Sequence, residues 1–305
     1  MSANKPICDL YILSAVTDLT FISQTVQHQV KQCKVNGSRI LRIDTAKVNG
    51  YYKKNRDTNS LNELLDIANT FVDKGLIDQV LKIDYEKNLL QKAYAKHFNR
   101  NFKETHCFRG YPFYGSILPF EHSEAEYIAL IDSDMLIFQS PDFNWIDKAV
   151  EVMEENPDIL CCLPLSGPPT ADKKLHQGNT EYYDDTARGL YLFKNFTSRI
   201  FVINIKKFLS LCPMEIQWLS WREPIYSKLF GRGKMLCWEA TVSKALEQSD
   251  MYRADLSSKL SWSLHPYERS KRFIEMLPDI IHKIENGIFP VKQSGHYELN
   301  LDWWE

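Results

Sequence analysis

YIALIDSDMLIF, residues 127–138, is the stretch of this chain that predicts its fold class. Its first five residues are largely apolar, Asp132 and Asp134 follow one residue apart, and four apolar residues close it. An apolar run of this length, bounded by polar residues, predicts a buried strand. Because ligands of open α/β sheets bind at the carboxyl ends of strands, the two aspartates stand where a binding site is expected.

The carboxylate pair itself indicates a cation site. Two carboxylates beside an apolar sheet cost free energy unless a cation compensates their charge. Oxygen ligands at this spacing, with open coordination positions, suit Mg²⁺ or Mn²⁺ that holds the phosphates of a substrate. The alternative is a chance Asp-x-Asp in a solvated turn. The apolar residues on both sides leave little room for such a turn.

Strand and helix patterns alternate through the first half of the chain. Strands are predicted over residues 8–16, 38–43, 77–83 and 127–131, and helices over residues 19–34, 60–74 and 85–99. Repeated strand–helix units predict a mainly parallel central sheet with helices on both faces. Because no internal repeat or low-complexity linker divides the chain, we expect one α/β domain with a C-terminal elaboration.

The second half follows a less regular pattern. Helices are predicted over residues 146–156 and 238–248, and strands over residues 158–163 and 197–205. Residues 166–189 form a long polar segment, which indicates a lid or a binding loop because compact domains seldom contain such loops otherwise. Residues 231–234, GRGK, form a basic and flexible turn.

Composition excludes several classes of protein. The 305 residues are 44% hydrophobic and carry a net charge of −2, so no general attraction to nucleic acid or to anionic membranes is expected. The apolar runs are strand-sized, which predicts no transmembrane segment, and the N-terminus has no signal-peptide pattern. Seven cysteines without a Cys-x-x-Cys pair favour reduced thiols over a disulfide framework or a zinc site.

These features predict a cytoplasmic protein. Association with the membrane surface through a lipid-linked acceptor stays open, although no basic amphipathic helix in the sequence favours it.

Four separated features resemble the GT-A class of nucleotide-sugar-dependent glycosyltransferases of the Asp-x-Asp type. They are the small polar turn at residues 14–18, Asp44 after the second strand, the Asp132-Ser-Asp134 motif, and Glu239 at a helix start. The resemblance implies a GT-A-like, Rossmann-like single domain over residues 1–305. Residues 1–138 would be its nucleotide-binding half and residues 139–305 its acceptor-binding half.

The resemblance also implies roles in binding the donor. Asp44 would accept a hydrogen bond from the imide of uracil or guanine, and its alternative role is a turn cap. Ala15 and Thr17 would line the base pocket, mostly through their backbone. Arg232 and Lys234 of the basic turn would clamp the diphosphate, and a solvated surface turn is the alternative.

For the metal, the resemblance implies that Asp134 binds Mn²⁺ or Mg²⁺ directly. Asp132 would contact the ribose or bind the metal more loosely. His265 is the candidate for a third ligand because imidazole binds Mn²⁺ well beside carboxylate oxygens. His282 and His296 compete with it for this role, since each follows a plausible turn or strand.

Glu239 is the candidate general base that would take the proton of the acceptor hydroxyl. Its alternative role is that of an acidic residue favoured by the helix dipole. The implied reaction is metal-dependent transfer of a sugar from a nucleotide donor, UDP-linked, to an acceptor hydroxyl. The sequence leaves open whether the anomeric configuration is inverted or retained and which sugar is moved. It also leaves open the acceptor (saccharide, lipid-linked or protein) and the oligomeric state.

Rival classes fit the sequence less well. A haloacid-dehalogenase-like phosphatase also carries Asp-x-Asp after a strand, but near its N-terminus and with Thr or Val where this chain has Leu136. A sugar-1-phosphate nucleotidyltransferase would have a basic glycine-rich loop after the first strand, and residues 14–20 contain neither glycine nor a basic residue. A non-enzymatic sugar- or protein-binding module would not need the aspartate pair.

Overall fold

The computed structural model describes residues 8–46, 60–176 and 181–305 of the chain. Within these residues the larger sheet has nine strands in the order β3-β2-β1-β4-β10-β6-β11-β9-β8. Their bounds are β1 Cys8–Ala15, β2 Arg39–Asp44, β3 Gln79–Lys82, β4 Tyr127–Asp132, β6 Ile159–Leu163, β8 Tyr183–Asp185, β9 Leu190–Phe193, β10 Ile200–Asn204 and β11 Tyr252–Leu256. All of these except β9 and β10 run in one direction, which confirms the mainly parallel sheet.

A smaller sheet lies against one side of the larger one. It contains β5 Leu136–Gln139, β12 Ser261–Pro266 and β13 Glu298–Leu299, and β7 Leu165–Ser166 pairs with β12. Because β5 follows β4 directly, the chain passes from the large sheet to the small one across residues 133–135, inside the Asp-x-Asp region. The motif therefore lies at the junction of the two sheets.

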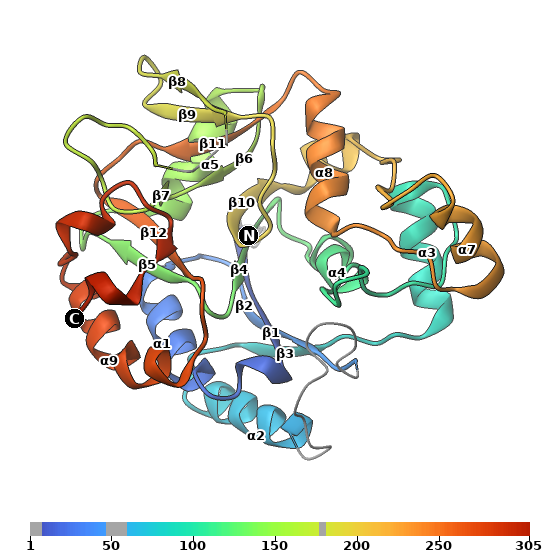
Figure 1. Ribbon diagram of the computed structural model, residues 1–305, viewed down its shortest axis with the longest axis horizontal. Helices are drawn as coiled ribbons and strands as arrows, with labels where there is room; N and C mark the ends of the chain where they lie inside the picture. Colours follow the sequence, from blue (N-terminus) through green and yellow to red (C-terminus); the bar gives the residue numbers. More distant parts are fainter. Residues whose placement is uncertain (1–7, 47–59, 177–180) are drawn as a thin grey trace, which may run out of the picture.

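Helices cover both sheets (Figure 1). Their bounds are α1 Ile22–Gln32, α2 Ser60–Asp73, α3 Lys87–Phe98, α4 Tyr114–His122, α5 Trp145–Glu155, α6 Ile205–Ser210, α7 Glu223–Phe230, α8 Trp238–Glu247 and α9 Lys271–Glu285. α1 and α9 pack on β5 of the small sheet, and α5 packs on β6 and β10. Figure 1 places α9 at one end of the molecule and α7 at the other.

The strands predicted in the first half are all present, within about two residues of their expected ends. β1 and β4 lie at the centre of the sheet, and their apolar runs are buried because helices cover both faces. The predicted helices correspond to α1, α2, α3, α5 and α8. The helix α4 was missed because Gly115 and Pro119 interrupt its sequence, and both residues normally weaken a helix pattern.

Two further expectations concern loops and membranes. The polar segment 166–189 contains β7 at its start and the edge strand β8, while residues 177–180 lie outside the described part, so its role as a binding loop stays a prediction. None of the helices in the described part of the chain has the length and apolarity of a membrane span.

Candidate functional site

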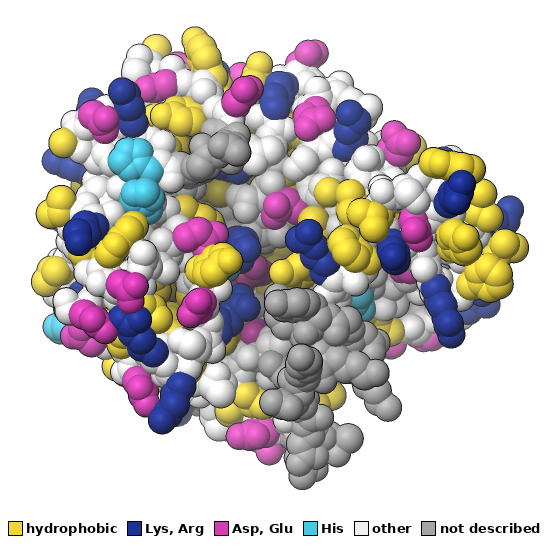
Figure 2. Space-filling view, viewed as in Figure 1, with side chains coloured by type: hydrophobic (Ala, Val, Ile, Leu, Met, Phe, Trp, Pro, Cys, Tyr) yellow, Lys and Arg dark blue, Asp and Glu magenta, His cyan; other side chains and the backbone are white. Residues whose placement is uncertain are grey.

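The carboxyl ends of three parallel strands meet at one place in the large sheet. β1 lies between β2 and β4, and the pairing sets Ala15 opposite Asp44 and Leu13 opposite Asp132. A cavity of about 340 Å³, here called the carboxylate cleft, opens there. Among the residues that line it are Ala15, Thr17, Asp44, Asp132, Asp134 and His265. Six side chains singled out in the sequence are therefore brought together, and Figure 2 shows acidic and basic side chains around this central hollow.

The turn after β1 is organised by Asp18. Its Oδ2 accepts hydrogen bonds from the Ala15 amide at 2.9 Å and from the Ser133 hydroxyl at 2.7 Å. Its Oδ1 accepts from the Thr17 hydroxyl at 2.5 Å. Asp18 thus ties the turn at residues 14–18 to the middle residue of the Asp-x-Asp motif, and the two segments form one wall of the cleft.

Asp44 caps the turn after β2, and its role toward a base stays a prediction. Its Oδ1 accepts from the Ala46 amide at 2.9 Å, as a turn cap does, and from the Tyr85 hydroxyl at 2.7 Å. Its Oδ2 lies 3.0 Å from His106 Nε2. Burial acts to raise the pKa of the Asp44 carboxyl, but His106 and Arg42 outweigh burial, so the pKa lies below its ordinary value. Asp44 is therefore an anionic acceptor in the cleft wall.

The motif's backbone is held by polar side chains of α1. Gln29 Nε2 donates to the carbonyl oxygens of Asp132 and Met135, each at 2.9 Å. His28 Nε2 accepts from the Ile137 amide at 2.9 Å. Both side chains are buried, so these bonds fix the path of the chain from β4 into β5. Burial raises the pKa of the Asp132 carboxyl to about 6, although nearby arginines oppose this shift.

Asp134 lies in the turn between β4 and β5, and His265 approaches it from β12 of the small sheet. His265 Nε2 lies 3.9 Å from Asp134 Oδ2, and that oxygen also accepts from Arg269 Nε at 2.6 Å. Asp134 Oδ1 is buried and has no hydrogen-bond partner among the residues that the structure describes. An unpartnered buried carboxylate oxygen is costly in a folded protein, so it indicates a place for a ligand.

Two neighbours fix the protonation of His265. Its Nδ1 lies 2.7 Å from Glu298 Oε2, and its Nε2 contacts the Arg199 guanidinium. Because guanidinium only donates, Nε2 must be the acceptor and Nδ1 must carry the proton. Burial, together with Arg199, lowers the pKa of the His265 imidazole below its ordinary value, so it is neutral at pH 7. A neutral imidazole held by a carboxylate is the form that binds metals.

These residues fit a divalent cation in part. Asp134 supplies a free carboxylate oxygen and His265 an oriented, neutral imidazole, which are ligand types that Mn²⁺ accepts. The described residues contain no group of three or more His, Cys, Asp or Glu side chains that could hold a metal. A cation here would therefore take its remaining ligands from substrate oxygens or water, as Mg²⁺ and Mn²⁺ commonly do beside phosphates.

Three arginines in the cleft were missed in the sequence. Arg42, Arg199 and Arg269 all line it, and Arg42 is 4% exposed. Within the described part of the chain, Arg42 Nε and Nη1 have no hydrogen-bond partner. Burial lowers the pKa of the Arg42 guanidinium, although Asp44 opposes the shift. The only sequence signal is a basic residue inside or beside an apolar strand, in RILRID and TSRIFVINI.

Glu239 lines a neighbouring cavity of about 240 Å³, the Glu239 cavity. It stands in the first turn of α8, and its Oε2 accepts from the Ser198 amide at 3.0 Å and the Ser198 hydroxyl at 3.1 Å. Arg42, Asp132 and Arg199 line this cavity as well as the carboxylate cleft, so the two spaces are adjacent. Arg109 also lines the Glu239 cavity, while Trp238 is buried among aromatic side chains.

Other candidates lie away from the cleft. Arg232 and Lys234 are exposed beside the C-terminal end of α7, and neither lines the carboxylate cleft or the Glu239 cavity. His282 is exposed on α9. His296 lies near His176 and Trp303 in another cavity. Of the three histidines considered as ligands, the structure brings only His265 to Asp134.

The chain also has two adjacent aspartates downstream of the Asp-x-Asp motif, and they lie far from the cleft. Asp184 and Asp185 lie on β8, the edge strand of the large sheet, where Asp185 pairs with Arg188. In the strand order, β8 is five positions from β4, which carries Asp132. The acidic pair that a phosphatase would need beside its Asp-x-Asp motif is therefore not supplied by these residues.

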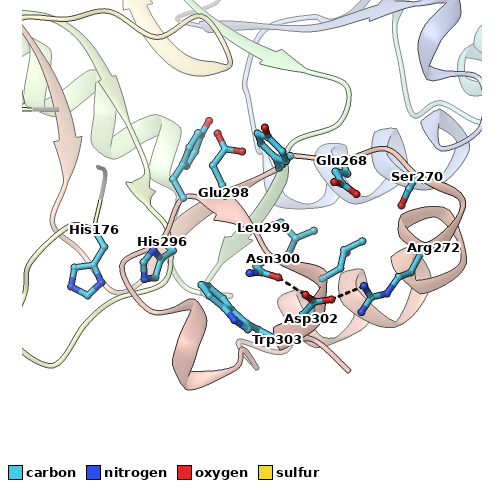
Figure 3. A pocket seen from close by; sticks show the side chains of 13 residues that line it. His176, Glu268, Ser270, Arg272, His296, Glu298, Leu299, Asn300, Asp302 and Trp303 are labelled. Carbon is cyan, nitrogen blue, oxygen red and sulfur yellow. Dashed lines mark hydrogen bonds and ion pairs between the residues drawn. The ribbon is translucent and has the colours of Figure 1, made fainter. Parts of the chain in front are cut away.

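A larger cavity of about 890 Å³ lies on the C-terminal side of the cleft (Figure 3). Its lining is polar and aromatic and includes His176, His296, Asn300, Asp302 and Trp303. Tyr267 and Glu298 line both this cavity and the carboxylate cleft, so the two spaces share a wall.

Comparisons with known proteins bear on the fold. No protein-family model and no curated protein sequence matches this chain. The chain is similar to a crystal structure of GalNAc-T7 with UDP, GalNAc and Mn²⁺, with 13% identity and a TM-score of 0.50 over 88% of this chain. It also matches a crystal structure of TarS from S. aureus, with 9% identity and a TM-score of 0.42 over 84% of this chain.

The chain spans 45% of the GalNAc-T7 chain and 36% of the TarS chain. The likeness to GalNAc-T7 concerns the fold and confirms the expected GT-A-like architecture, a mixed α/β domain with a large central sheet flanked by helices.

Proposed function

We propose that this chain is a metal-dependent glycosyltransferase that moves a sugar from a nucleotide donor, UDP-linked, to an acceptor hydroxyl. The observation that carries the proposal is the meeting of Asp132, Asp134 and His265 with Arg199 and Arg269 at the carboxyl ends of parallel strands. A cleft that contains both carboxylates and guanidiniums suits a ligand that carries phosphates and a cation. The carboxylates can bind the cation, and the guanidiniums can bind the phosphates.

The nucleoside would lie on the β1–β2 side of the cleft. There the backbone of residues 15–17 and the Asp44 carboxylate form the wall. Among the described residues, His106 is the hydrogen-bond partner of Asp44 Oδ2, and a carboxylate oxygen can accept a further hydrogen bond, here from a base imide. Uracil and guanine both offer an imide N–H, so this contact is compatible with UDP and with GDP.

The diphosphate would lie between Asp134 and the arginines. Arg269 pairs with Asp134, and Arg199 contacts His265. When phosphate oxygens enter, both guanidiniums can turn to them, which frees Asp134 and the Nε2 of His265 for a cation. A divalent cation bound there would stabilise the negative charge that develops on the leaving nucleoside diphosphate.

The acceptor would react beside Glu239. Its carboxylate faces the cavity that adjoins Asp132, and Ser198 holds it through one oxygen, which leaves the other free to accept a proton. Both halves of the chain line this cavity, with Tyr111 and Asp132 from the first half and Ser198 and Trp238 from the second. The C-terminal cavity, with Trp303 and Tyr267 in its wall, offers aromatic faces for an extended saccharide acceptor.

The first test is calorimetric titration of UDP and GDP in the presence of Mn²⁺ and again with a chelator. The wild-type protein is compared with Asp134→Asn and with Asp142→Asn, an exposed aspartate that serves as the matched control. We expect one nucleotide to bind only with Mn²⁺. Its affinity should fall at least about 100-fold in Asp134→Asn, since even outer partners of metal ligands contribute about 10–100-fold.

Thermal unfolding of Asp134→Asn checks that the loss is local, because asparagine can still accept the hydrogen bond from Arg269. A nucleotide-sugar screen for release of the nucleoside diphosphate then identifies the sugar. Absence of binding for both nucleotides under every condition would overturn the proposal, and so would metal-dependent binding that Asp134→Asn leaves unchanged.

A further inference from the structure

The end of the molecule that carries α7 exposes a cluster of large apolar side chains, here called the α7 patch. Its members are between 47% and 76% exposed: Leu219, Trp221, Ile225, Tyr226, Leu229 and Phe230. Trp221 is the most exposed of them, although its spacing of three residues from Trp218 is typical of two residues that face a core. Apolar groups gathered in this way on a soluble domain mark an interaction surface.

The patch does not serve the packing of α7 itself. Ser227 is the buried residue of this helix, and its hydroxyl donates to Glu104 Oε2 at 2.6 Å. Glu104 Oε1 accepts from the Gly233 amide at 2.7 Å. A side chain at Gly233 would collide with Trp218 and Ser227, so the loop lies close against the inner face of the helix. Polar bonds and close backbone contact hold α7, while its apolar side chains point outward.

Basic side chains surround the patch. The exposed cations are Lys103, Arg222, Lys228, Arg232 and Lys234, and Arg222 lies over the Trp221 ring at 5.1 Å. The one acidic residue of α7, Glu223, accepts the Lys234 backbone amide at 2.8 Å. The chain as a whole carries a net charge of −2, so this positive surface is local. In Figure 2 hydrophobic and basic side chains lie together at the end where Figure 1 places α7.

We propose that the α7 patch docks this protein on a lipid bilayer surface that carries anionic headgroups. Tryptophan, tyrosine and phenylalanine settle at the interface between headgroups and acyl chains. Arginine and lysine beside them reach the phosphates and are attracted by anionic lipid. A second copy of the chain fits this surface less well, because two such patches would bring the same five cations together.

Docking in this way places the carboxylate cleft near the lipid. The Phe108 amide donates to the Met235 carbonyl at 2.9 Å, next to Lys234, and Tyr111 three residues later lines the cleft. Residues 108–111 therefore connect the rim of the patch to the mouth of the cleft. The docking does not depend on the proposed transferase activity, since it rests on the surface alone.

Vesicle flotation tests the proposal with the full chain. Vesicles of phosphatidylcholine alone are compared with vesicles that also contain phosphatidylglycerol. We expect binding to the anionic vesicles, weakened by high salt. The double variant Trp221→Ser with Leu229→Ser should lower the partition coefficient at least about tenfold, because two large apolar side chains are lost from the interface.

Two further variants separate charge from apolar contact. Arg222→Gln with Lys228→Gln should weaken binding to anionic vesicles by about fivefold for each cation removed and leave binding to neutral vesicles unchanged. Ile288→Ser with Val291→Ser removes two exposed apolar side chains after α9, at the other end of the molecule, and should change nothing.

Equal binding by the Trp221/Leu229 variant and the wild type would overturn the proposal, as would failure of the wild type to float with either vesicle. Sedimentation velocity tests the remaining alternative, in which the α7 patch joins two copies of the chain. A dimer that this variant dissociates, without vesicle binding, would assign the patch to self-association instead. If the double variant unfolds, Trp221→Ala is used in its place. Quenching of the wild-type tryptophan fluorescence by brominated lipid then reports whether the protein contacts the bilayer.

Discussion

The carboxylate cleft and the α7 patch depart from ordinary protein packing in opposite directions. In the cleft, charged groups are buried, and Asp134 is 2% exposed. One oxygen of Asp134 and two donor nitrogens of Arg42 have no partner among residues 8–46, 60–176 and 181–305. In the patch, apolar side chains such as Trp221 and Phe230 face solvent. Both arrangements lower the stability of the fold, because unpaired buried polar groups and exposed apolar groups are unfavourable.

The two regions are therefore expected to bind partners of different kinds. An unpaired buried charge is satisfied by a small, highly charged ligand that can enter a cleft. An exposed apolar surface with a basic rim is satisfied by an extended apolar phase with negative charges at its border. Substitutions in the two regions should therefore change the binding of a ligand far more than they change the free energy of unfolding.

The largest effect is expected for Glu239→Gln. Glutamine keeps the shape and can still accept the hydrogen bonds from Ser198, but it cannot take a proton. Turnover should fall by about 10²–10⁴-fold, which is the usual contribution of a general base. The Kd for UDP with Mn²⁺ should stay within about twofold, because in the proposed reaction Glu239 acts on the acceptor.

Ser198→Ala is the matched control, since it removes one donor to Glu239 and keeps the carboxylate. Steady-state kinetics and calorimetry on the same preparations measure both quantities. An equal loss of turnover and of UDP affinity in Glu239→Gln would show that this residue shapes the cleft rather than the reaction.

The cleft was largely predictable because its signal is local. An aspartate pair that interrupts an apolar run is visible in residues 127–138, and the strand patterns around it place it at the carboxyl edge of a parallel sheet. Asp44 follows from the same argument at the end of β2. His265 lies about 130 residues from Asp134, so its position rested on resemblance and not on any local pattern.

The remaining parts depend on contacts that no short segment encodes. Arg42 and Arg199 resemble ordinary basic residues near strands, and only the assembled sheet brings them into one space. Glu298 orients His265 from a strand of two residues near the C-terminus. In α7, apolar residues at helical spacing such as Ile225 and Leu229 normally predict a core face. Ser227 is buried instead, which shows that the helix turns its apolar side outward.

An intermediate effect is expected for Arg42→Lys. Lysine keeps the positive charge that faces Asp44 and Asp132 but loses the planar fork and the unpaired Nε and Nη1 donors. If those donors await the donor nucleotide, UDP affinity should fall by about tenfold, the value of one charge-assisted hydrogen bond. The free energy of unfolding should change by less than about 1 kcal/mol.

Arg39→Lys is the matched control on the same strand, where the arginine pairs with Asp78 outside the cleft. It should leave UDP affinity unchanged. Calorimetry and urea unfolding measure the two quantities, and the contrary finding is an Arg42→Lys protein that is strongly destabilised while it binds UDP normally. That finding would show that Arg42 stabilises the fold and does not bind the nucleotide.

The smallest effect is expected for a polar cluster that belongs to neither region. Glu121 Oε1 lies 2.7 Å from both His97 Nε2 and Lys96 Nζ. Burial acts to raise the pKa of the Glu121 carboxyl, but His97 and Lys96 outweigh burial and lower it to about 2. Because the folded-state pKa is depressed, the carboxylate stabilises the fold above its ordinary pKa, and this contribution is lost as the pH falls toward 2.

Glu121→Gln should therefore lower the free energy of unfolding at pH 7 by about 1 kcal/mol, a value reduced by the partial exposure of the pair. Between about pH 5 and pH 2 the wild type should lose this advantage, so the two unfolding curves should converge. Glu124→Gln, an exposed carboxylate nearby, should match the wild type throughout. UDP binding should be unchanged in both variants, because here the polar groups already have partners within the protein and await no ligand.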